Sequence, residues 1–176
     1  YFLMFTRHYS IQQNETMNHT SATDQVSETI SDHQFVKVML NKLTGQKSLQ
    51  SSAHFQQGDV ICKFDAKTTE THPTYLTIQT GEDQHITLSP EFLQYTNHSC
   101  DPNAFFDTNA MELVCLKDVQ PGDELTYFYP STEWEMDQPF ECHCGSENCL
   151  QLIRGATHLS PEVMSTYRFS DYIRRK

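Results

Sequence analysis

The chain has 176 residues, with 23 Asp and Glu against 12 Lys and Arg, which gives a formal net charge of −11. This length predicts a single domain that can bury a hydrophobic core without disulfide bonds. The only basic cluster is Arg174-Arg175-Lys176, so we expect no direct nucleic acid binding, which requires a positive face. No apolar run is long enough to cross a membrane, and an acidic surface suits a basic protein partner as well as simple solubility.

The N-terminal region is predicted to be a tail. Residues 1–5 are apolar but lack the small-residue cleavage pattern of a signal peptide, so the protein is expected to be intracellular rather than secreted. Because the chain starts on Tyr, it is expected to be a fragment or an upstream read-through, with Met4 or Met17 as candidate starts. Residues 6–33 are polar and aperiodic, so they bury too little surface to offset their ordering entropy. We therefore predict a disordered tail over 1–33.

The folded part is predicted to be mainly β. Alternating or β-branched runs bounded by turn residues indicate short strands at 35–39, 59–64, 74–79, 85–88, 104–106, 111–116 and 125–129. Two Ser-Pro pairs indicate helix starts. Ser89-Pro90 is expected to cap a short helical turn, and Ser160-Pro161 is expected to open a C-terminal helix.

The six cysteines are not spaced like those of a secreted disulfide scaffold. Cys142, Cys144 and Cys149 lie within eight residues, a clustering typical of a metal site. Cys62 and Cys115 lie in strand-like runs, where a small buried hydrophobic role is favoured. The compartment is therefore expected to be reducing, either the cytosol or the nucleus.

Three motifs occur in a fixed order along the chain. They are Asn97-His98-Ser99-Cys100, the segment from Gly122-Asp123-Glu124 to Tyr129, and the C-x-C-x4-C cluster that starts at Cys142. Together they resemble the SET-domain protein lysine methyltransferases that carry a post-SET zinc module. The resemblance implies a SET fold, with several small sheets around a threaded, pseudoknot-like C-terminal segment. It places the SET domain at 34–130, the post-SET segment at 131–154 and a helical extension at 155–176.

The implied reaction sets physical requirements on the site. The lysine amine, with a pKa near ~10.4, must become uncharged, which favours a desolvated aromatic channel. It must also lie in line with the methyl group and the sulfur of S-adenosylmethionine (SAM). By the resemblance, Tyr129 places its hydroxyl beside the transferring methyl group, and Tyr127 limits the products to mono- or dimethyl-lysine. Family members commonly carry Asp at the position of Phe128, so we expect a changed channel wall or a change just behind it.

The cofactor residues are also implied by the resemblance. Asn97 and His98 match the residues that hold SAM, although the same segment could simply be a structural turn. The first cofactor loop of the family reads Gly-x-Gly, whereas this chain has Gly45 followed by Lys47-Ser48-Leu49. Because glycines allow the backbone to approach SAM closely, the loss of one glycine is expected to affect the affinity for SAM. The implied cofactor-binding set is Asn97, His98, Lys47, Ser48, Leu49, Tyr129 and Leu150.

A closed structural zinc site needs four ligands, and the cluster supplies three thiolates. The family solution takes the fourth from the motif cysteine, which is Cys100 here, so the implied ligands are Cys100, Cys142, Cys144 and Cys149. His143 is the less favoured alternative, because its neighbours on both sides are ligands. Such a site would clamp the C-terminal segment over the active site.

Three functions remain open at this point. The first is SAM-dependent methylation of a lysine on a protein or peptide. The second is a catalytically inactive SET-like binding module that keeps zinc but binds SAM weakly or not at all, because of the altered glycine loop. The third is a structural zinc-ribbon protein. The sequence identifies no substrate protein, histone or otherwise.

Overall fold

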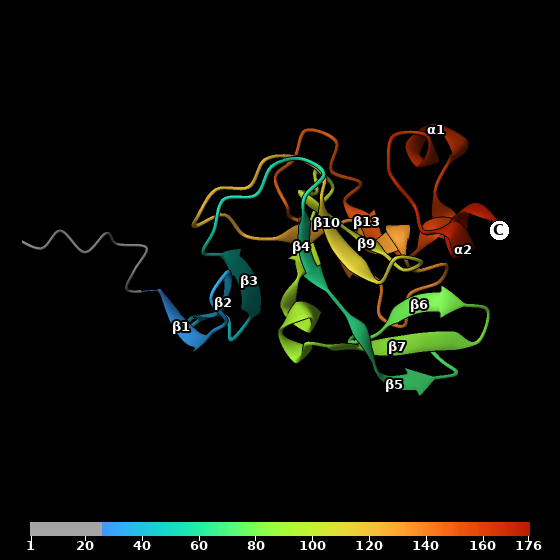
Figure 1. The fold of residues 1–176 in the computed structure, drawn as a ribbon. Coiled ribbons are helices and arrows are strands. Elements are labelled where there is room, and N and C mark those ends of the chain that lie inside the picture. Colours follow the sequence, from blue (N-terminus) through green and yellow to red (C-terminus); the bar gives the residue numbers. More distant parts are fainter. Residues whose placement is uncertain (1–25) are drawn as a thin grey trace, which may run out of the picture.

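The computed structural model describes residues 26–176 and confirms a mainly β fold of small sheets (Figure 1). The strands are β1 Ser27–Asp32, β2 Val36–Asn41, β3 Lys47–Ser51, β4 Val60–Lys63, β5 Asp65–Glu70, β6 Ile78–Gly81, β7 Gln84–Ser89, β8 Asn97–His98, β9 Ala104–Asp107, β10 Glu112–Cys115, β11 Thr126–Tyr127, β12 Phe140–Glu141 and β13 Leu152–Ile153. They form the sheets β1-β2-β3, β4-β10-β9, β5-β7-β6, β8-β11 and β12-β13. The helical turns are η2 Glu91–Tyr95, η3 Tyr129–Ser131, η4 Ala156–His158, α1 Pro161–Met164 and α2 Asp171–Arg174.

The sheet β1-β2-β3 corrects the predicted start of the folded part. Residues 27–32 form β1, which pairs antiparallel with β2 from Ser27↔Asn41 to Asp32↔Lys37. The predicted tail is therefore wrong for these residues, and residues 1–25 lie outside the described part of the chain. The polar side chains of β1 are largely exposed. The strand exists because its backbone pairs with β2, a non-local cause that composition does not reveal.

Exposure also explains a second missed strand. All six residues of β5 are exposed, yet β5 pairs with β7 from Asp65↔Ser89 to Glu70↔His85. β3 was not predicted either, and the strand expected at 74–79 overlaps β6 only at residues 78–79. The strands at β2, β4, β7, β9, β10 and β11 were predicted within a few residues of their bounds.

The Asn-His motif forms a crossing. β8 pairs in parallel with β11, with Asn97 beside Thr126 and His98 beside Tyr127. The Asn103 side chain fastens this crossing, because its amide donates to the Glu124 carbonyl at 2.8 Å and accepts from the Thr126 amide at 2.8 Å. Two segments almost thirty residues apart are thereby held side by side.

The helix starts were predicted well in one case and less well in the other. Ser160 caps α1, since its hydroxyl accepts from the Val163 amide at 3.3 Å. A helical turn, η2, follows Ser89-Pro90, but Pro90 takes the cap position and Ser89 makes no side-chain capping bond. A second C-terminal helix, α2, was not predicted, although Ser170 caps it in the same way.

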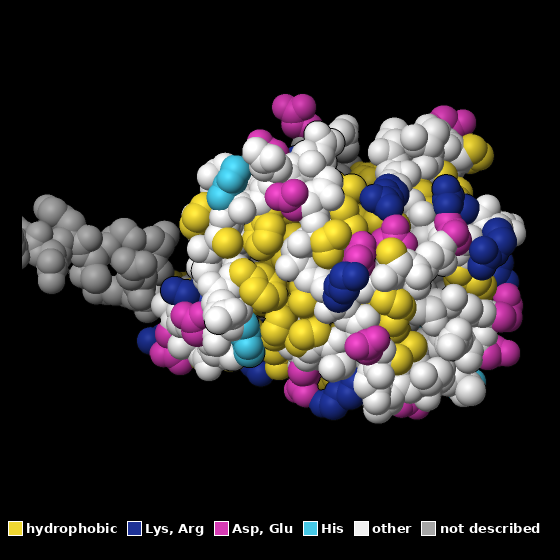
Figure 2. All heavy atoms as spheres, in the orientation of Figure 1, with side chains coloured by type: hydrophobic (Ala, Val, Ile, Leu, Met, Phe, Trp, Pro, Cys, Tyr) yellow, Lys and Arg dark blue, Asp and Glu magenta, His cyan; other side chains and the backbone are white. Residues whose placement is uncertain are grey.

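Two hydrophobic clusters position the site. The larger one joins the sheets and contains fully buried residues such as Leu49, Phe106 and Leu113. The smaller one joins Phe128 to the C-terminal extension through Phe169 and Ile173. α1 and α2 lie at the end of the molecule opposite β1-β2-β3 (Figure 1). On the face drawn in Figure 2, acidic and basic side chains surround a central area of hydrophobic side chains.

Candidate functional site

Two cavities meet at Tyr129. The narrow cavity has a volume of about 310 Å³ and is lined mostly by apolar and aromatic side chains, among them Phe106 and Tyr127. The wide cavity has a volume of about 1120 Å³ and is lined by more polar residues, among them Asn97 and Glu124. The residues that line both cavities are Tyr75, Leu76, Gln94, Tyr129 and Phe140. A small aromatic chamber and a large polar one therefore share one wall.

Tyr129 is held in place by its neighbours. Its backbone amide donates to Nδ1 of His98 at 3.2 Å, and its hydroxyl donates to the Thr96 carbonyl at 3.4 Å. Burial, together with the nearby Glu124 carboxylate, raises the pKa of Tyr129 to about 12. The hydroxyl is therefore neutral at physiological pH, and it lies where the two cavities join.

Tyr127 belongs to the narrow cavity alone. Its ring packs edge-on against Phe106 at 4.8 Å between centroids and lies 4.7 Å from the ring of Tyr129. Burial raises the pKa of its hydroxyl well above the ordinary value, so this hydroxyl is also neutral. The two tyrosines thus add two neutral hydroxyl groups to the lining of the narrow cavity, which also includes polar residues such as Gln94 and Glu133.

Asn97 and His98 hold the wall of the wide cavity. The Asn97 amide donates to the Lys47 carbonyl at 3.0 Å and to the Glu124 carboxylate at 2.8 Å, so it joins β3 to the segment before β11. Burial lowers the pKa of His98 to about 4. Since its Nδ1 accepts from Tyr129, its Nε2 carries the proton and donates to the Cys100 sulfur at 3.3 Å.

The predicted first loop is only partly at the wide cavity. Lys47 and Ser48 line it, and Gly45, in the left-handed conformation at φ 74°, lines it too. Leu49 is fully buried in the larger core cluster. Its side chain packs in this core and not at the wide cavity, so Leu49 could reach a cofactor there only through its backbone.

Leu150 and Phe128 also lie away from the cavities. The Leu150 side chain packs beside the cysteine cluster, and its amide donates to the Cys100 sulfur at 3.4 Å. Leu150 does not line the wide cavity among the described residues. Phe128 stacks on Tyr167 with ring centroids 3.8 Å apart, so it is not part of the channel wall.

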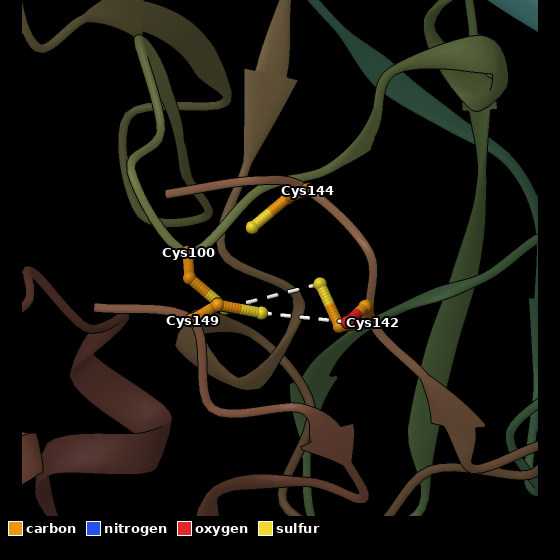
Figure 3. Close-up of side chains that lie close together, drawn as sticks. All are labelled: Cys100, Cys142, Cys144 and Cys149. Atoms are coloured by element: carbon orange, nitrogen blue, oxygen red, sulfur yellow. Dashed lines mark hydrogen bonds between the residues drawn. The ribbon is translucent and has the colours of Figure 1, made fainter. Parts of the chain in front are cut away.

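The four predicted cysteines come together (Figure 3). The sulfurs of Cys100, Cys142, Cys144 and Cys149 all lie within 4.8 Å of one another. A tetrahedral zinc site with bonds of about 2.3 Å separates its sulfurs by about 3.8 Å, so this donor set and spacing fit the metal. His143 is exposed and lies outside the cluster, where Glu141 is its neighbour.

Several lining residues were missed by the motif reasoning. Glu124 belongs to the Gly-acidic-acidic segment and could have been found from its place two residues before β11. Gln94 comes from the helical turn η2 and Phe140 from the strand β12, and no local pattern marks them. Glu133 lines the narrow cavity and is buried, which is unusual for a carboxylate.

The fold and the two joined cavities define a class of proteins, the methyltransferases built on small β sheets around a crossing of this kind. A family model described as "SET domain" matches residues 5–130, and the chain belongs to the SET-domain family. SET-domain methyltransferases use SAM as the methyl donor. The match starts well before residue 34, which agrees with the correction made by β1.

Relatives carry methyltransferase names. The chain is 40% identical to "Methyltransferase flvH" of Aspergillus flavus over 129 residues, and this matched region covers 72% of each chain. It is 30% identical over 92 residues to "Histone-lysine N-methyltransferase, H3 lysine-36 specific" of Aspergillus oryzae, covering 49% of this chain and 9% of that protein. The protein of the same name in Saccharomyces cerevisiae is 27% identical over 106 residues, covering 57% of this chain and 14% of that one. The chain thus spans only a small part of the two histone enzymes.

Among residues 26–176, no helix has both the length and the apolar character that a membrane crossing requires.

Proposed function

We propose that this protein transfers a methyl group from SAM to the side-chain amine of a lysine on a protein or peptide, giving mono- or dimethyl-lysine. The observation that carries the proposal is that Tyr129 lines both cavities. A cofactor in the wide cavity and an amine in the narrow cavity would meet at this residue. Two of the relatives are named as histone-lysine N-methyltransferases specific for H3 lysine-36, and these names support a protein substrate for this chain too.

The narrow cavity suits a lysine side chain. Its apolar walls would strip water from the ammonium group and lower its pKa, which favours the reactive neutral amine. The faces of Tyr127, Tyr129 and Phe106 also tolerate a methylated ammonium product, since aromatic rings attract cations. The Tyr129 hydroxyl, fixed by the Thr96 carbonyl, would orient the amine at the junction.

The wide cavity suits SAM. Asn97, His98, Lys47 and Ser48 would hold it, with Glu124 as an additional polar neighbour. SAM supplies an electrophilic methyl group when bound. The wide cavity is open beside Gly45 although the loop has only this one glycine, so no observation here favours the inactive binding module.

The cysteine cluster suits Zn²⁺, with Cys100, Cys142, Cys144 and Cys149 as ligands. The metal would be structural, because four protein thiolates leave no open coordination position. It would join the crossing at β8 to the segment around β12 and β13. We propose that residues 131–154 form this post-SET segment, that 155–176 form an extension docked on Phe128, and that the protein acts in the nucleus or cytosol.

The test is methyl transfer from labelled SAM onto a lysine peptide array that includes histone tails. Wild-type protein should label lysine-containing peptides and fail to label the same peptides with norleucine in place of lysine. Tyr129→Phe serves as the matched control, because it keeps the ring and removes only the hydroxyl. The absence of any labelled peptide or lysate protein, together with no thermal shift at millimolar SAM, would refute the proposal.

A further inference from the structure

The narrow cavity contains a buried carboxyl group that the proposed reaction has not yet used. Glu133 is only 5% exposed and lines the cavity together with Tyr127 and Tyr129. Its backbone amide donates to the Tyr129 carbonyl at 3.1 Å, so it follows the catalytic tyrosine by one helical turn. A carboxyl group is thereby fixed in the chamber where the lysine side chain is expected.

One oxygen of this carboxyl group is occupied and the other is available. Within the described residues, the Glu133 side chain accepts two hydrogen bonds, both at Oε1. One comes from the Gln79 backbone amide at 2.9 Å and the other from the Thr132 hydroxyl at 3.3 Å. The Gln79 side chain returns a bond by accepting from the Trp134 amide at 3.0 Å. Oε1 and Gln79 thus fix the carboxyl group, and Oε2 is left for a partner that enters the cavity.

No cationic side chain among the described lining residues balances this group. Among the described residues that line the narrow cavity, none is Lys, Arg or His. Burial raises the pKa of Glu133 to about 8, against the weaker opposing effect of the bonds from Gln79 and Thr132. An isolated buried carboxylate is unfavourable, and a cation that enters beside it relieves that cost.

The other ionisable groups near Glu133 do not replace such a cation. Tyr127 and Tyr129 are neutral near pH 8, because burial raises both of their pKa values. His85, which pairs with Gln79 across β6 and β7, has a pKa lowered by burial and is neutral as well. Asp137 lines the cavity from an exposed position. The Gln79 side chain also donates to the Tyr172 hydroxyl. Lys176, the cation on the far side of Tyr172, is paired with Glu82 and so does not serve Glu133.

We propose that Glu133 receives the ammonium group of the substrate lysine in the narrow cavity and accepts one of its protons. This inference rests on the proposed lysine methylation and adds a residue to it. The N–H bond of the ammonium breaks, its electron pair stays on nitrogen, and the proton forms an O–H bond with Glu133. The neutral amine is then able to attack the methyl group of SAM, and Glu133 returns the proton to water after the product leaves.

The physical reason is that burial reduces the difference between the pKa of the lysine ammonium and the pKa of the Glu133 carboxyl group. Burial lowers the pKa of an ammonium and raises that of a carboxyl group, so the neutral pair of amine and carboxylic acid becomes competitive with the ion pair. An amide at this position would accept the same Gln79 bond but could neither attract the cation nor take its proton. Binding therefore requires the carboxylate form, whose fraction rises as pH increases through about 8.

The first experiment observes Glu133 directly, without cofactor or activity. In protein labelled with ¹³C at the Glu carboxyl carbons, the Glu133 signal is the one lost in Glu133→Gln. We expect it to titrate near pH 8 and to shift its midpoint downwards by about one unit in saturating n-butylammonium, a mimic of the lysine side chain. 1-Butanol, which has no charge, should leave the midpoint unchanged. An equal response to the two probes would overturn the inference.

The second experiment measures kcat/KM against pH. Wild-type activity should rise about tenfold per pH unit below the Glu133 midpoint, since only the carboxylate is competent. Glu133→Gln keeps the acceptor for the Gln79 amide, and it should lose this rising limb and about 10²–10³ in kcat/KM. Asp137→Asn, which removes an exposed charge from the same cavity, should keep the limb. Glu133→Asp should also keep the limb at a lower rate, and it replaces Gln as the test variant if Gln fails to fold.

The outcomes separate the two proposals. If the wild type methylates lysine and Glu133→Gln has an unchanged pH profile, Glu133 has only a structural role and this inference fails. If n-butylammonium shifts the Glu133 signal but no lysine substrate is ever methylated, the proposed function fails and the cation site in the cavity stands.

Discussion

At the scale of single residues, Tyr129 is the side chain on which both cavities depend. His98 accepts a hydrogen bond from the Tyr129 backbone amide, and the Tyr129 hydroxyl makes a separate bond to the Thr96 carbonyl. The hydroxyl bond to Thr96 is long at 3.4 Å, so its contribution to folding is small and its position can serve the reaction instead.

Tyr129→Phe should lower kcat by about 100-fold, the usual effect of removing one oriented hydrogen-bonding group from a transition state. SAM affinity and the melting temperature should stay close to wild type, because the ring and its packing remain. Steady-state kinetics and calorimetric titration with SAM measure the two effects separately. A variant with wild-type turnover would remove Tyr129 from the mechanism.

Tyr127→Phe should shift the products towards di- and trimethyl-lysine. The Tyr127 hydroxyl lies in the narrow cavity, and its removal frees about the volume of one water, ~30 Å³, beside the amine. Phe128 cannot fill that space, because its ring is stacked on Tyr167. Mass spectrometry of a methylated peptide gives the product ratio. If the wild type already makes mainly trimethyl-lysine, Tyr127 does not limit the products.

At the scale of elements, the cysteine cluster joins the crossing to the end of the chain. Cys100 lies two residues after β8, and the other three cysteines lie between β12 and β13. Beside the cluster, the Tyr167 hydroxyl donates to the Cys100 carbonyl at 2.8 Å. The segment between β12 and β13 and the C-terminal extension are therefore attached to the crossing at two neighbouring points.

Freshly purified reduced protein should contain about one equivalent of zinc. Chelation should lower the melting temperature and abolish methyl transfer, since apo thiols lose the binding energy that a structural zinc contributes to folding. The protein should keep much of its β circular dichroism signal, because the larger core cluster contains no member of the metal site. Elemental analysis that finds less than about half an equivalent would count against the site.

Tyr167 allows the second attachment to be divided into its parts. Tyr167→Phe removes only the hydroxyl bond to Cys100 and should cost about 1 kcal/mol in the free energy of unfolding. Tyr167→Ala also removes the stack on Phe128 and should cost about 3 kcal/mol. Denaturant unfolding measures both values. Equal costs for the two variants would mean that the stack does not stabilise the extension.

At the scale of the whole molecule, the charge of −11 favours basic substrates. Acidic residues also lie at the cavities themselves, with Glu91, Glu124 and Glu141 on the wide one and Asp137 on the narrow one. A peptide with several Lys or Arg residues around the target would approach through an attractive field.

We expect KM for such a basic peptide to rise on the order of tenfold between about 0.01 M and about 0.5 M salt, because salt screens exposed charges. A peptide with the same target lysine and neutral flanks should show little change in KM. Equal salt dependence for the two peptides would place the effect on SAM or on the enzyme rather than on substrate attraction.

The sequence by itself determined the features that are written in short local patterns. Ser160 as a cap and the clustered thiols of Cys142, Cys144 and Cys149 follow from residue types at close spacing. These features were predictable because local hydrogen bonding, or a ligand set that is nearly complete within a few residues, fixes them. The family resemblance supplied the rest of that set through Cys100.

Only the tertiary structure decided what depends on partners far away in the chain. β1 and β5 are strands because they pair with β2 and β7, whereas their own side chains are mostly exposed. Leu49 is in the core because of the face that β3 presents, and Phe128 is under the extension because it packs against Tyr167 and Phe169. Glu133 looks like an ordinary acidic residue in the sequence. Its burial comes from the packing of Gln79 and the two tyrosines around it, and no local pattern encodes that packing.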